Sequence, residues 1–260
     1  MDERIFVYGE GVTEKIVLKR LVDDLEENRI QVTAVGGKNN FETRILEDLE
    51  PEFNTGVPGQ YVRVLVFRDL DFGEKADNVR RSFSRIVRNL VGKESQWRGV
   101  ETIPNVSVCS IPPDNDRSGL RLVLHLAEKP RTSPGNDGLG LPDFKDKTTD
   151  GYLLWMGLTS NVVARFARDI KVEPSIISDI VETELPELFC PAAADIRIPF
   201  DSDKDYLSAY LVSTRFWKVK RTEEKERLAG IILDRAKKFA KEDFETIMGS
   251  WMAAIKEVQK

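Results

Sequence analysis

Short apolar runs alternate with longer segments of mixed polarity in the first half of the chain. The apolar runs predict four buried strands, at residues 4–9, 31–35, 61–68 and 106–111. Apolar residues at helical spacing predict helices at residues 12–25, 41–49, 76–91 and 120–127. Strands that alternate with helices favour right-handed crossover connections. We therefore expect an α/β fold with a Rossmann-like, mostly parallel, four-stranded sheet flanked by helices.

The second half of the chain begins with an irregular segment. Residues 128–148, EKPRTSPGNDGLGLPDFKDKT, are rich in Gly, Pro and Asp, as in a long loop or a linker. Beyond this segment the pattern is helical, at residues 152–168, 174–184, 205–212, 223–240 and 241–258. We expect an α/β domain at residues 1–148, which includes the loop, and an all-helical domain at residues 149–260.

The composition is that of a soluble globular protein. Hydrophobic residues make up 41% of the chain and charged residues 32%, which leaves ample material for a core. No apolar run approaches the ~20 residues that span a bilayer, and the acidic N-terminal residues do not resemble a signal peptide. The two cysteines, Cys109 and Cys190, form no CxxC motif. These features favour a cytoplasmic protein without a zinc site, a disulfide scaffold or a membrane partner.

Charge and histidine content narrow the function classes further. The net charge of -5 argues mildly against a protein that coats nucleic acid, so contact with nucleic acid would depend on a local basic patch. His125 is the one histidine, and no serine lies on a recognisable nucleophile turn, which disfavours a Ser-His-Asp mechanism. Within LVLHLAE, we expect His125 to be a partly buried helix residue.

Carboxylates follow two of the predicted strands. Glu10 lies between two glycines after the first strand, and Asp69 and Asp71 follow the third. Ligands of open α/β sheets bind at the carboxyl ends of strands. If the first and third strands are neighbours, ~4.8 Å apart, Glu10 faces the aspartate pair. Carboxylates this close repel one another unless a divalent cation lies among them, and a ligand set made only of oxygen suits Mg²⁺ or Mn²⁺.

A simpler interpretation of these acids is structural. Glu10 and Glu14 would both stabilise the positive N-terminal end of the helix that follows the first strand. Asp69 and Asp71 would then be solvated loop residues.

The two motifs, YGEGVTEK and LVFRDLDF, together resemble the TOPRIM domain of type IA and type II topoisomerases, bacterial primases and OLD-family nucleases. The Glu-Gly-x-Thr-Glu form is most similar to the OLD-like branch and to small stand-alone TOPRIM proteins, and the resemblance covers residues 4–127. It implies that Glu10, Asp69 and Asp71 bind one or two Mg²⁺ ions for phosphoryl transfer on nucleic acid. Glu14 matches the second acid of the nuclease-like form.

The segment after the fourth predicted strand departs from that family, in which further acidic or serine residues and a lysine follow this strand. Here the segment is PPDNDRSG, residues 112–119, and it supplies Asp114, Asp116 and Ser118. Lys147 is the nearest candidate for the late lysine. These four residues are additional site candidates, although Asp, Asn and Ser also form ordinary turns after Pro-Pro.

Two basic segments are candidates for binding nucleic acid. Arg81, Arg85 and Arg88 recur on one face of the helix predicted at residues 76–91, where they would hold a phosphate backbone. An ordinary solvated helix face gives the same pattern. Residues 215–221, RFWKVKR, mix cations with aromatic rings that can stack on bases. Core aromatic residues beside a basic surface would look the same.

The leading hypothesis is a Mg²⁺-dependent nuclease that cleaves DNA or RNA phosphodiester bonds. Glu10, Asp69 and Asp71 would hold the metal, and Glu14 would help to hold a second ion or to position water. The alternative is a TOPRIM-like interaction module with little catalysis, part of a system such as antiviral defence, which binds a protein partner or a second copy. A primase-like nucleotidyl transferase is a third hypothesis, but the sequence shows no zinc-binding module for it.

Overall fold

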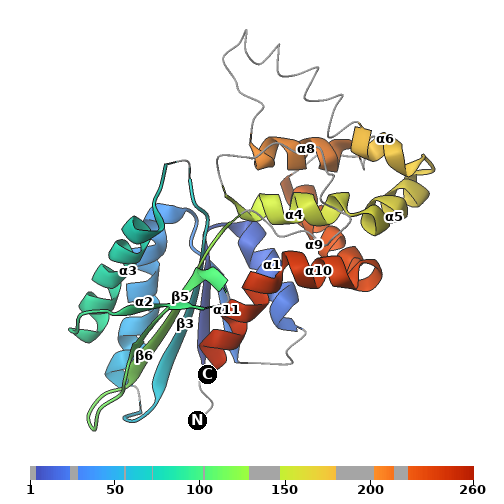
Figure 1. Cartoon of the computed structure of the whole chain (residues 1–260). Helices are drawn as coiled ribbons and strands as arrows, with labels where there is room; N and C mark the ends of the chain where they lie inside the picture. The colour runs from blue at the N-terminus through green and yellow to red at the C-terminus, as the bar shows by residue number, and fades with distance from the viewer. Residues whose placement is uncertain are drawn as a thin grey trace. The chain divides into compact units, whose positions relative to one another are not determined.

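The computed structural model describes residues 4–23, 29–55, 57–71, 73–101, 103–128, 147–179, 202–213 and 222–260. The chain forms two compact units. We call them the α/β unit, Met1–Glu128 with Ser250–Lys260, and the helical unit, Lys129–Gly249. The α/β unit thus includes the last helix of the chain, which lies well beyond the boundary at residue 148 expected from composition (Figure 1).

The α/β unit is built on a six-stranded sheet with the order β2-β1-β3-β6-β5-β4. The strands are β1 (Ile5–Gly9), β2 (Ile30–Ala34), β3 (Tyr61–Arg68), β4 (Trp97–Val100), β5 (Ile103–Ile111) and β6 (Gly119–Leu126). The strands β2, β1, β3 and β6 are parallel, whereas β5 runs antiparallel to β6 and β4 antiparallel to β5. The predicted α/β class with flanking helices is confirmed. The sheet, however, is mixed and has six strands rather than four.

The largest error in the predicted elements concerns β6. Residues 120–127 were expected to form a helix, but Gly119–Leu126 is a strand between β3 and β5. Its residues are buried on both faces of the sheet, and such a strand has a continuous apolar run that resembles a buried helix. The expectation missed β4 as well, because this edge strand has four residues and is partly exposed.

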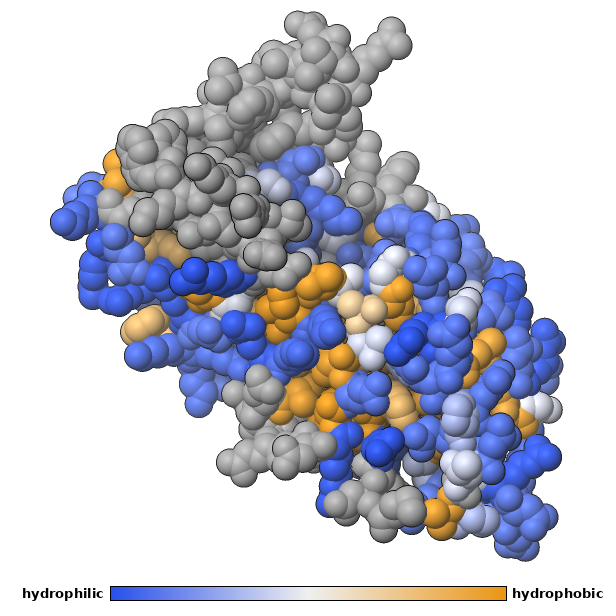
Figure 2. Space-filling view, turned by 180° about the vertical axis from the view of Figure 1, so that it is seen from behind, coloured by the Kyte–Doolittle hydropathy of each residue, from blue (hydrophilic) through white to orange (hydrophobic). Residues whose placement is uncertain are grey.

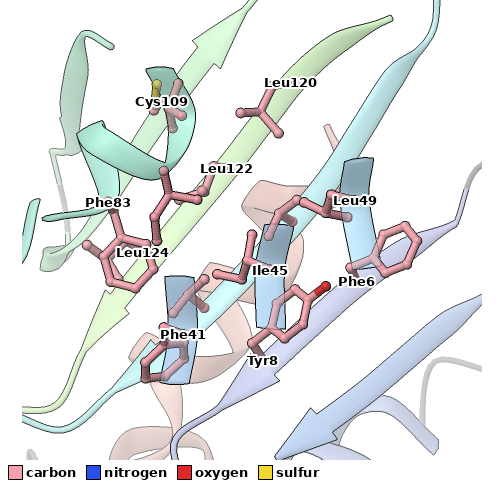
Figure 3. Close-up of a cluster of buried hydrophobic side chains, with 14 of the residues drawn as sticks. Phe6, Tyr8, Phe41, Ile45, Leu49, Phe83, Cys109, Leu120, Leu122 and Leu124 are labelled. Carbon is pink, nitrogen blue, oxygen red and sulfur yellow. The ribbon is translucent and has the colours of Figure 1, made fainter. Parts of the chain in front are cut away.

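Two helices cover one face of the sheet. Helices α2 (Phe41–Thr55) and α3 (Ala76–Val91) bury their apolar sides against alternate residues of β1, β3, β6 and β5. Figure 3 shows Phe41 and Ile45 of α2 beside Tyr8 of β1 in this core. The bounds of α3 agree with the prediction. Helix α2 is longer than predicted and continues past Pro51, with Phe53 packed against the core.

The C-terminal helix lies on the other face of the sheet, on which Phe67 and His125 stand. Helix α11 (Gly249–Gln259) stacks Trp251 on Phe67, with ring centroids 4.3 Å apart. Two arginines from the strands hold its C-terminal carbonyl groups: Arg63 donates to Val258 O at 2.9 Å, and Arg121 donates to Glu257 O at 2.8 Å. Such hydrogen bonds satisfy the free carbonyls at a helix end. Helix α1 (Val12–Asp23) packs on β1 and β2.

His125 is a core residue of β6 rather than a helix residue. Its ring is buried beside the stacked rings of Phe67 and Trp251, with centroids 4.8 and 5.2 Å away. The Nε2 atom lies 3.0 Å from Ser250 Oγ and 3.2 Å from Asn105 Nδ2. Burial lowers the pKa of His125 to about 3, so the ring is neutral at physiological pH.

The helical unit contains α4 (Thr149–Leu158), α5 (Ser160–Ile170), α6 (Pro174–Asp179), α8 (Asp203–Ser213), α9 (Thr222–Phe239) and α10 (Lys241–Ile247). All residues of α4 are buried, which identifies it as the centre of this unit. Tyr210 of α8 donates to Gly157 O of α4 at 2.8 Å. A Cβ at Gly157 would come within 2.8 Å of the same tyrosine ring, so the two helices need a glycine at this contact.

The helices of the second half differ from the prediction mainly in their breaks. The segment expected to be one helix at residues 152–168 is divided at Thr159, and the segment at 241–258 is divided at Met248. Both residues lie between two short helices, which sequence periodicity alone does not separate.

The surface drawn in Figure 2 is mostly hydrophilic, with smaller hydrophobic areas between the charged residues. Four large apolar side chains of the described residues are exposed: Val12, Val57, Ile176 and Phe239. None of the described helices is both long and apolar enough to span a bilayer. Cys109 is a buried free thiol, and Cys190 lies outside the described residues.

Candidate acidic site at the carboxyl ends of β1 and β3

The chain connections change sides at the strand pair β1 and β3. Strand β1 lies between β2 and β3 and is parallel to both. Helix α1 connects β1 to β2, and α2, which packs on the opposite face, connects β2 to β3 (Figure 1). In open α/β sheets, such a reversal leaves a crevice beyond the carboxyl ends of the two strands. The predicted neighbourhood of β1 and β3 is therefore confirmed, and the candidate acids follow these strands at this point of the sheet.

The glycines on either side of Glu10 allow α1 to begin directly at the tip of β1. A Cβ at Gly9 would lie 2.5 Å from the Glu14 Cβ, closer than carbon atoms approach without a shift. The Gly11 N–H donates to Glu14 Oε2 at 2.6 Å, so this carboxylate satisfies a free donor at the helix start. Glu14 is buried and has a clear structural role at the N-terminus of α1.

The strand register brings Glu10 to Arg68 rather than to the aspartates. Gly9 pairs with Phe67, so the next residues along the two strands, Glu10 and Arg68, are opposite each other. Residues in register on neighbouring strands have their side chains on the same face of the sheet. Glu10 therefore shares a face with Arg68 and not with Asp69, which is one position further along. Arg68 Nη1 donates to Glu10 Oε2 at 3.0 Å.

Arg68 is the centre of the charge network at these strand ends. Its Nη2 donates to both carboxylate oxygens of Glu74, at 2.8 and 3.0 Å, and its Nη1 also donates to Asp69 O at 2.7 Å. The Arg68 side chain is only 6% exposed, whereas the Glu10 and Glu74 side chains are about one quarter exposed. Arg68 and Glu74 were not among the predicted site residues, although both lie within RDLDFGE, the segment that contains the aspartate pair.

The two aspartates occupy different environments. Asp69 is buried, whereas Asp71 is half exposed and forms an ion pair with Lys38 of the short helix η1 (Lys38–Asn40). The Gly36 and Gly37 N–H groups donate to Glu10 O at 3.0 and 2.9 Å, which holds the β2–η1 loop against the tip of β1. The hydrogen bond and the negative charge of Asp71 raise the pKa of Lys38 above its usual value.

The acids do not form a ready metal site. Among the described residues, no group of three or more His, Cys, Asp or Glu side chains has the arrangement needed to hold a metal ion. Glu10 and Asp71 instead form ion pairs with Arg68 and Lys38. The donors are of the kind that Mg²⁺ prefers, but a metal would have to compete with these two cations.

The further site candidates lie elsewhere. The turn that holds Asp114, Asp116 and Ser118 follows β5, which runs antiparallel to β6. Through Leu120 of β6, the end of β5 is aligned with Val62, near the start of β3. The length of β3, about 20 Å, therefore separates these residues from Arg68. Lys147 belongs to the helical unit.

The turn after β5 has the structure that its composition indicates. Asp114 Oδ1 accepts from the Asp116 N–H at 3.2 Å, which forms a local turn. This hydrogen bond, helped by Lys93, lowers the pKa of Asp114. Ser118 donates to Val57 O at 3.1 Å.

The arginines of α3 have different partners. Arg85 forms an ion pair with Glu42 of α2, and Arg88 lies 3.6 Å from Glu94. Arg81 donates to Asn78 Oδ1 at 2.6 Å. The second basic segment, residues 215–221, lies outside the described residues.

Comparison with known proteins supplies no relative from which a function could be transferred. No protein-family model, no curated protein and no solved structure matches the chain.

Proposed function

We propose that this protein hydrolyses phosphodiester bonds of DNA or RNA at the carboxyl ends of β1 and β3, with Mg²⁺ or Mn²⁺. The observation that carries the proposal is that β1 and β3 are parallel neighbours, so that Glu10, Asp69 and Asp71 follow them at the same end of the sheet, where the chain connections change sides. The motifs around these acids resemble those of TOPRIM nucleases. No Cys or His is needed in such a site, because hard cations take oxygen ligands.

The ion pairs at the site can be exchanged for a metal at moderate cost. The Lys38 and Asp71 side chains are 42% and 46% exposed, and an exposed pair of this kind stabilises a fold by at most about 1 kcal/mol. When Glu10 leaves Arg68, this arginine keeps its bidentate bond to Glu74 and its bond to Asp69 O. The buried guanidinium is therefore still paired after Glu10 turns away.

The side chains of the site would then have distinct roles. Glu10, Asp69 and Asp71 would hold the ion, which when bound polarises a phosphate and lowers the pKa of bound water. Arg68 fixes the backbone at Asp69 through its carbonyl, and Glu14 fixes the start of α1. Lys38, released from Asp71, would present its ammonium group to a substrate phosphate at the same end of the sheet.

A cleavage assay tests this proposal. Labelled single-stranded and duplex DNA and RNA are incubated with the protein in Mg²⁺, Mn²⁺ or EDTA. We expect metal-dependent cleavage by the wild type and at least a hundredfold loss in the double variant Asp69→Asn/Asp71→Asn. The matched control is Asp116→Asn, an exposed aspartate in the turn after β5. Equal cleavage by the wild type and the double variant would refute the site.

The second candidate function is an interaction module with little catalysis, as part of a system such as antiviral defence. The position of Arg68 favours it, because its guanidinium already lies between Glu10 and Glu74, where it balances their charge without a metal. A thermal melt in millimolar Mg²⁺ or Mn²⁺ distinguishes the two functions. A metal-dependent rise in melting temperature that is lost in Asp69→Asn/Asp71→Asn supports the enzyme. An unchanged melting temperature, together with binding of a protein partner or a second copy, supports the module.

A further inference from the structure

A polar cavity lies between the first turns of α3 and strands β4 and β5. Its volume is about 590 Å³, within the range of small-molecule sites. The residues that line it include two arginines, two serines, a tryptophan and an aspartate: Arg80, Arg81, Ser84, Ser107, Trp97 and Asp77. All of them belong to the α/β unit.

Hydrogen bonds hold the walls of this cavity in place. Arg80 donates from Nε to Ser107 Oγ at 3.0 Å and from Nη1 to Asp77 Oδ1 at 2.6 Å. Trp97 donates from Nε1 to Ser84 Oγ at 2.9 Å. The arginine and the indole ring thus have fixed positions, which lowers the entropy lost when a ligand binds.

Arg81 gives the cavity a positive charge. It is exposed, and its hydrogen bonds go to two neutral acceptors, Asn78 Oδ1 at 2.6 Å and Asp77 O at 3.4 Å. Neutral acceptors leave its charge uncompensated, in contrast to Arg85 and Arg88, which pair with glutamates. An anion near Arg81 would gain a charge-assisted hydrogen bond.

The cavity lies toward the same end of the sheet as the carboxyl ends of β1 and β3. Ser107 pairs with Leu124, and Leu124 pairs with Val66, two residues before Arg68. Strand β5 is two positions from β3 in the sheet, a separation of about 10 Å. A nucleic-acid strand that reaches the acidic site can therefore also reach this cavity.

We propose that the cavity binds one unpaired nucleotide of a single-stranded nucleic acid, with its base against Trp97 and its phosphate at Arg81. A cation beside an aromatic ring and two hydroxyl groups suits a phosphate and a base, and bases stack on aromatic side chains without strong sequence preference. A paired base in a duplex does not expose its flat face to such a ring. This inference rests on the proposed function in one respect, because it specifies the substrate as single-stranded.

Binding is measured in EDTA, so that the result does not depend on catalysis. Fluorescence anisotropy of a short labelled single strand gives the Kd of the wild type and of Arg81→Gln, Trp97→Leu and Gly99→Leu. Gly99 lines the cavity, pairs with Ser107 in register, and has open space where a Cβ would lie. A leucine there fills the cavity without removing any wall contact, which keeps the test valid if Trp97→Leu is unstable.

The control variant is Arg88→Gln, with the same charge change two turns further along α3 and outside the cavity. We expect about tenfold weaker binding for Arg81→Gln, Trp97→Leu and Gly99→Leu, little change for Arg88→Gln, and weaker binding of duplex. Equal losses in Arg81→Gln and Arg88→Gln would indicate diffuse charge attraction and overturn the proposal. Unchanged binding in Gly99→Leu, or equally tight binding of duplex, would overturn it too.

The two proposals fail in distinguishable ways. Tight, cavity-dependent binding without cleavage in Mg²⁺ or Mn²⁺ refutes the nuclease and keeps the nucleotide site. Cleavage that Asp69→Asn/Asp71→Asn abolishes, but that Gly99→Leu and Trp97→Leu leave unchanged at low substrate concentration, refutes the nucleotide site and keeps the nuclease.

Discussion

Two short acidic segments follow strands of the same sheet and have opposite environments. After β3, the buried Arg68 donates to Asp69 O and to Glu10, the acid that follows β1, and Asp71 pairs with a lysine from η1. After β5, Asp114 and Asp116 form an exposed local turn. Similar residue types are found in both, so composition does not separate them. The direction of the strand does, because β3 ends beside the end of β1 and β5 ends at the other end of the sheet.

The largest effect that would test this contrast is expected from Arg68. Replacing it in Arg68→Met leaves Glu10 and Glu74 close together without their shared cation. Losing one partner of a buried pair costs about 3–5 kcal/mol, and the partial exposure of both glutamates lowers our expectation to about 2–3 kcal/mol. Urea unfolding measures the loss. The control is Lys93→Met beside Asp114, with a loss below about 1 kcal/mol. Similar losses in the two variants would remove the contrast.

A pH titration tests the burial of His125 on β6, the strand that lies between β3 and β5. The pKa of His125 falls from 6.5 to about 3 in the folded protein, so the unfolded chain binds the proton first as pH decreases. Stability is therefore retained above pH 6.5 and decreases below it, by about 2 kcal/mol at pH 5. Urea unfolding at several pH values checks this expectation. In His125→Gln the decrease between pH 6.5 and 5 should be much smaller, and an identical decrease in both proteins would assign it to other groups.

Close backbone approaches occur at both ends of the sheet, and glycine substitutions compare them. A Cβ at Gly9 would lie 2.5 Å from Glu14 Cβ, and a Cβ at Gly119 would lie 2.5 Å from Pro113 N. We expect Gly9→Ala and Gly119→Ala each to lower the free energy of unfolding by about 1–3 kcal/mol, because tightly packed atoms must move. Gly99→Ala, with open space around its Cβ, is the control. Thermal melting of the three variants ranks them, and a melt of Gly99→Ala as low as the others would contradict this explanation.

The smallest expected effect on stability concerns the two exposed lysines. Lys38→Met and Lys93→Met should each change the free energy of unfolding by less than about 1 kcal/mol, because both ion pairs are half exposed. They should differ in metal binding. Lys38→Met removes the ion pair between Lys38 and Asp71 and should tighten Mn²⁺ binding, measured by calorimetry, whereas Lys93→Met should leave it unchanged. No difference between the two variants would argue against Asp71 as a ligand.

The sequence by itself determined the elements whose pattern has one interpretation. The run at β3 and the amphipathic pattern of α3 predicted their bounds correctly, and the glycines around Glu10 marked the end of β1. Local composition also indicated the turn at Asp114. These features depend on interactions between residues that are close in the chain, so a short segment contains the information for them.

Only the tertiary structure decided how those elements combine. The apolar run of β6 fits a helix or a central strand, and burial on both faces made it a strand. The antiparallel direction of β5 then placed Asp114 and Asp116 far from β1, and the register of β1 against β3 placed Glu10 opposite Arg68. Strand direction and register depend on packing across the whole sheet, and a shift of one residue in β3 would present Asp69 to Glu10 instead.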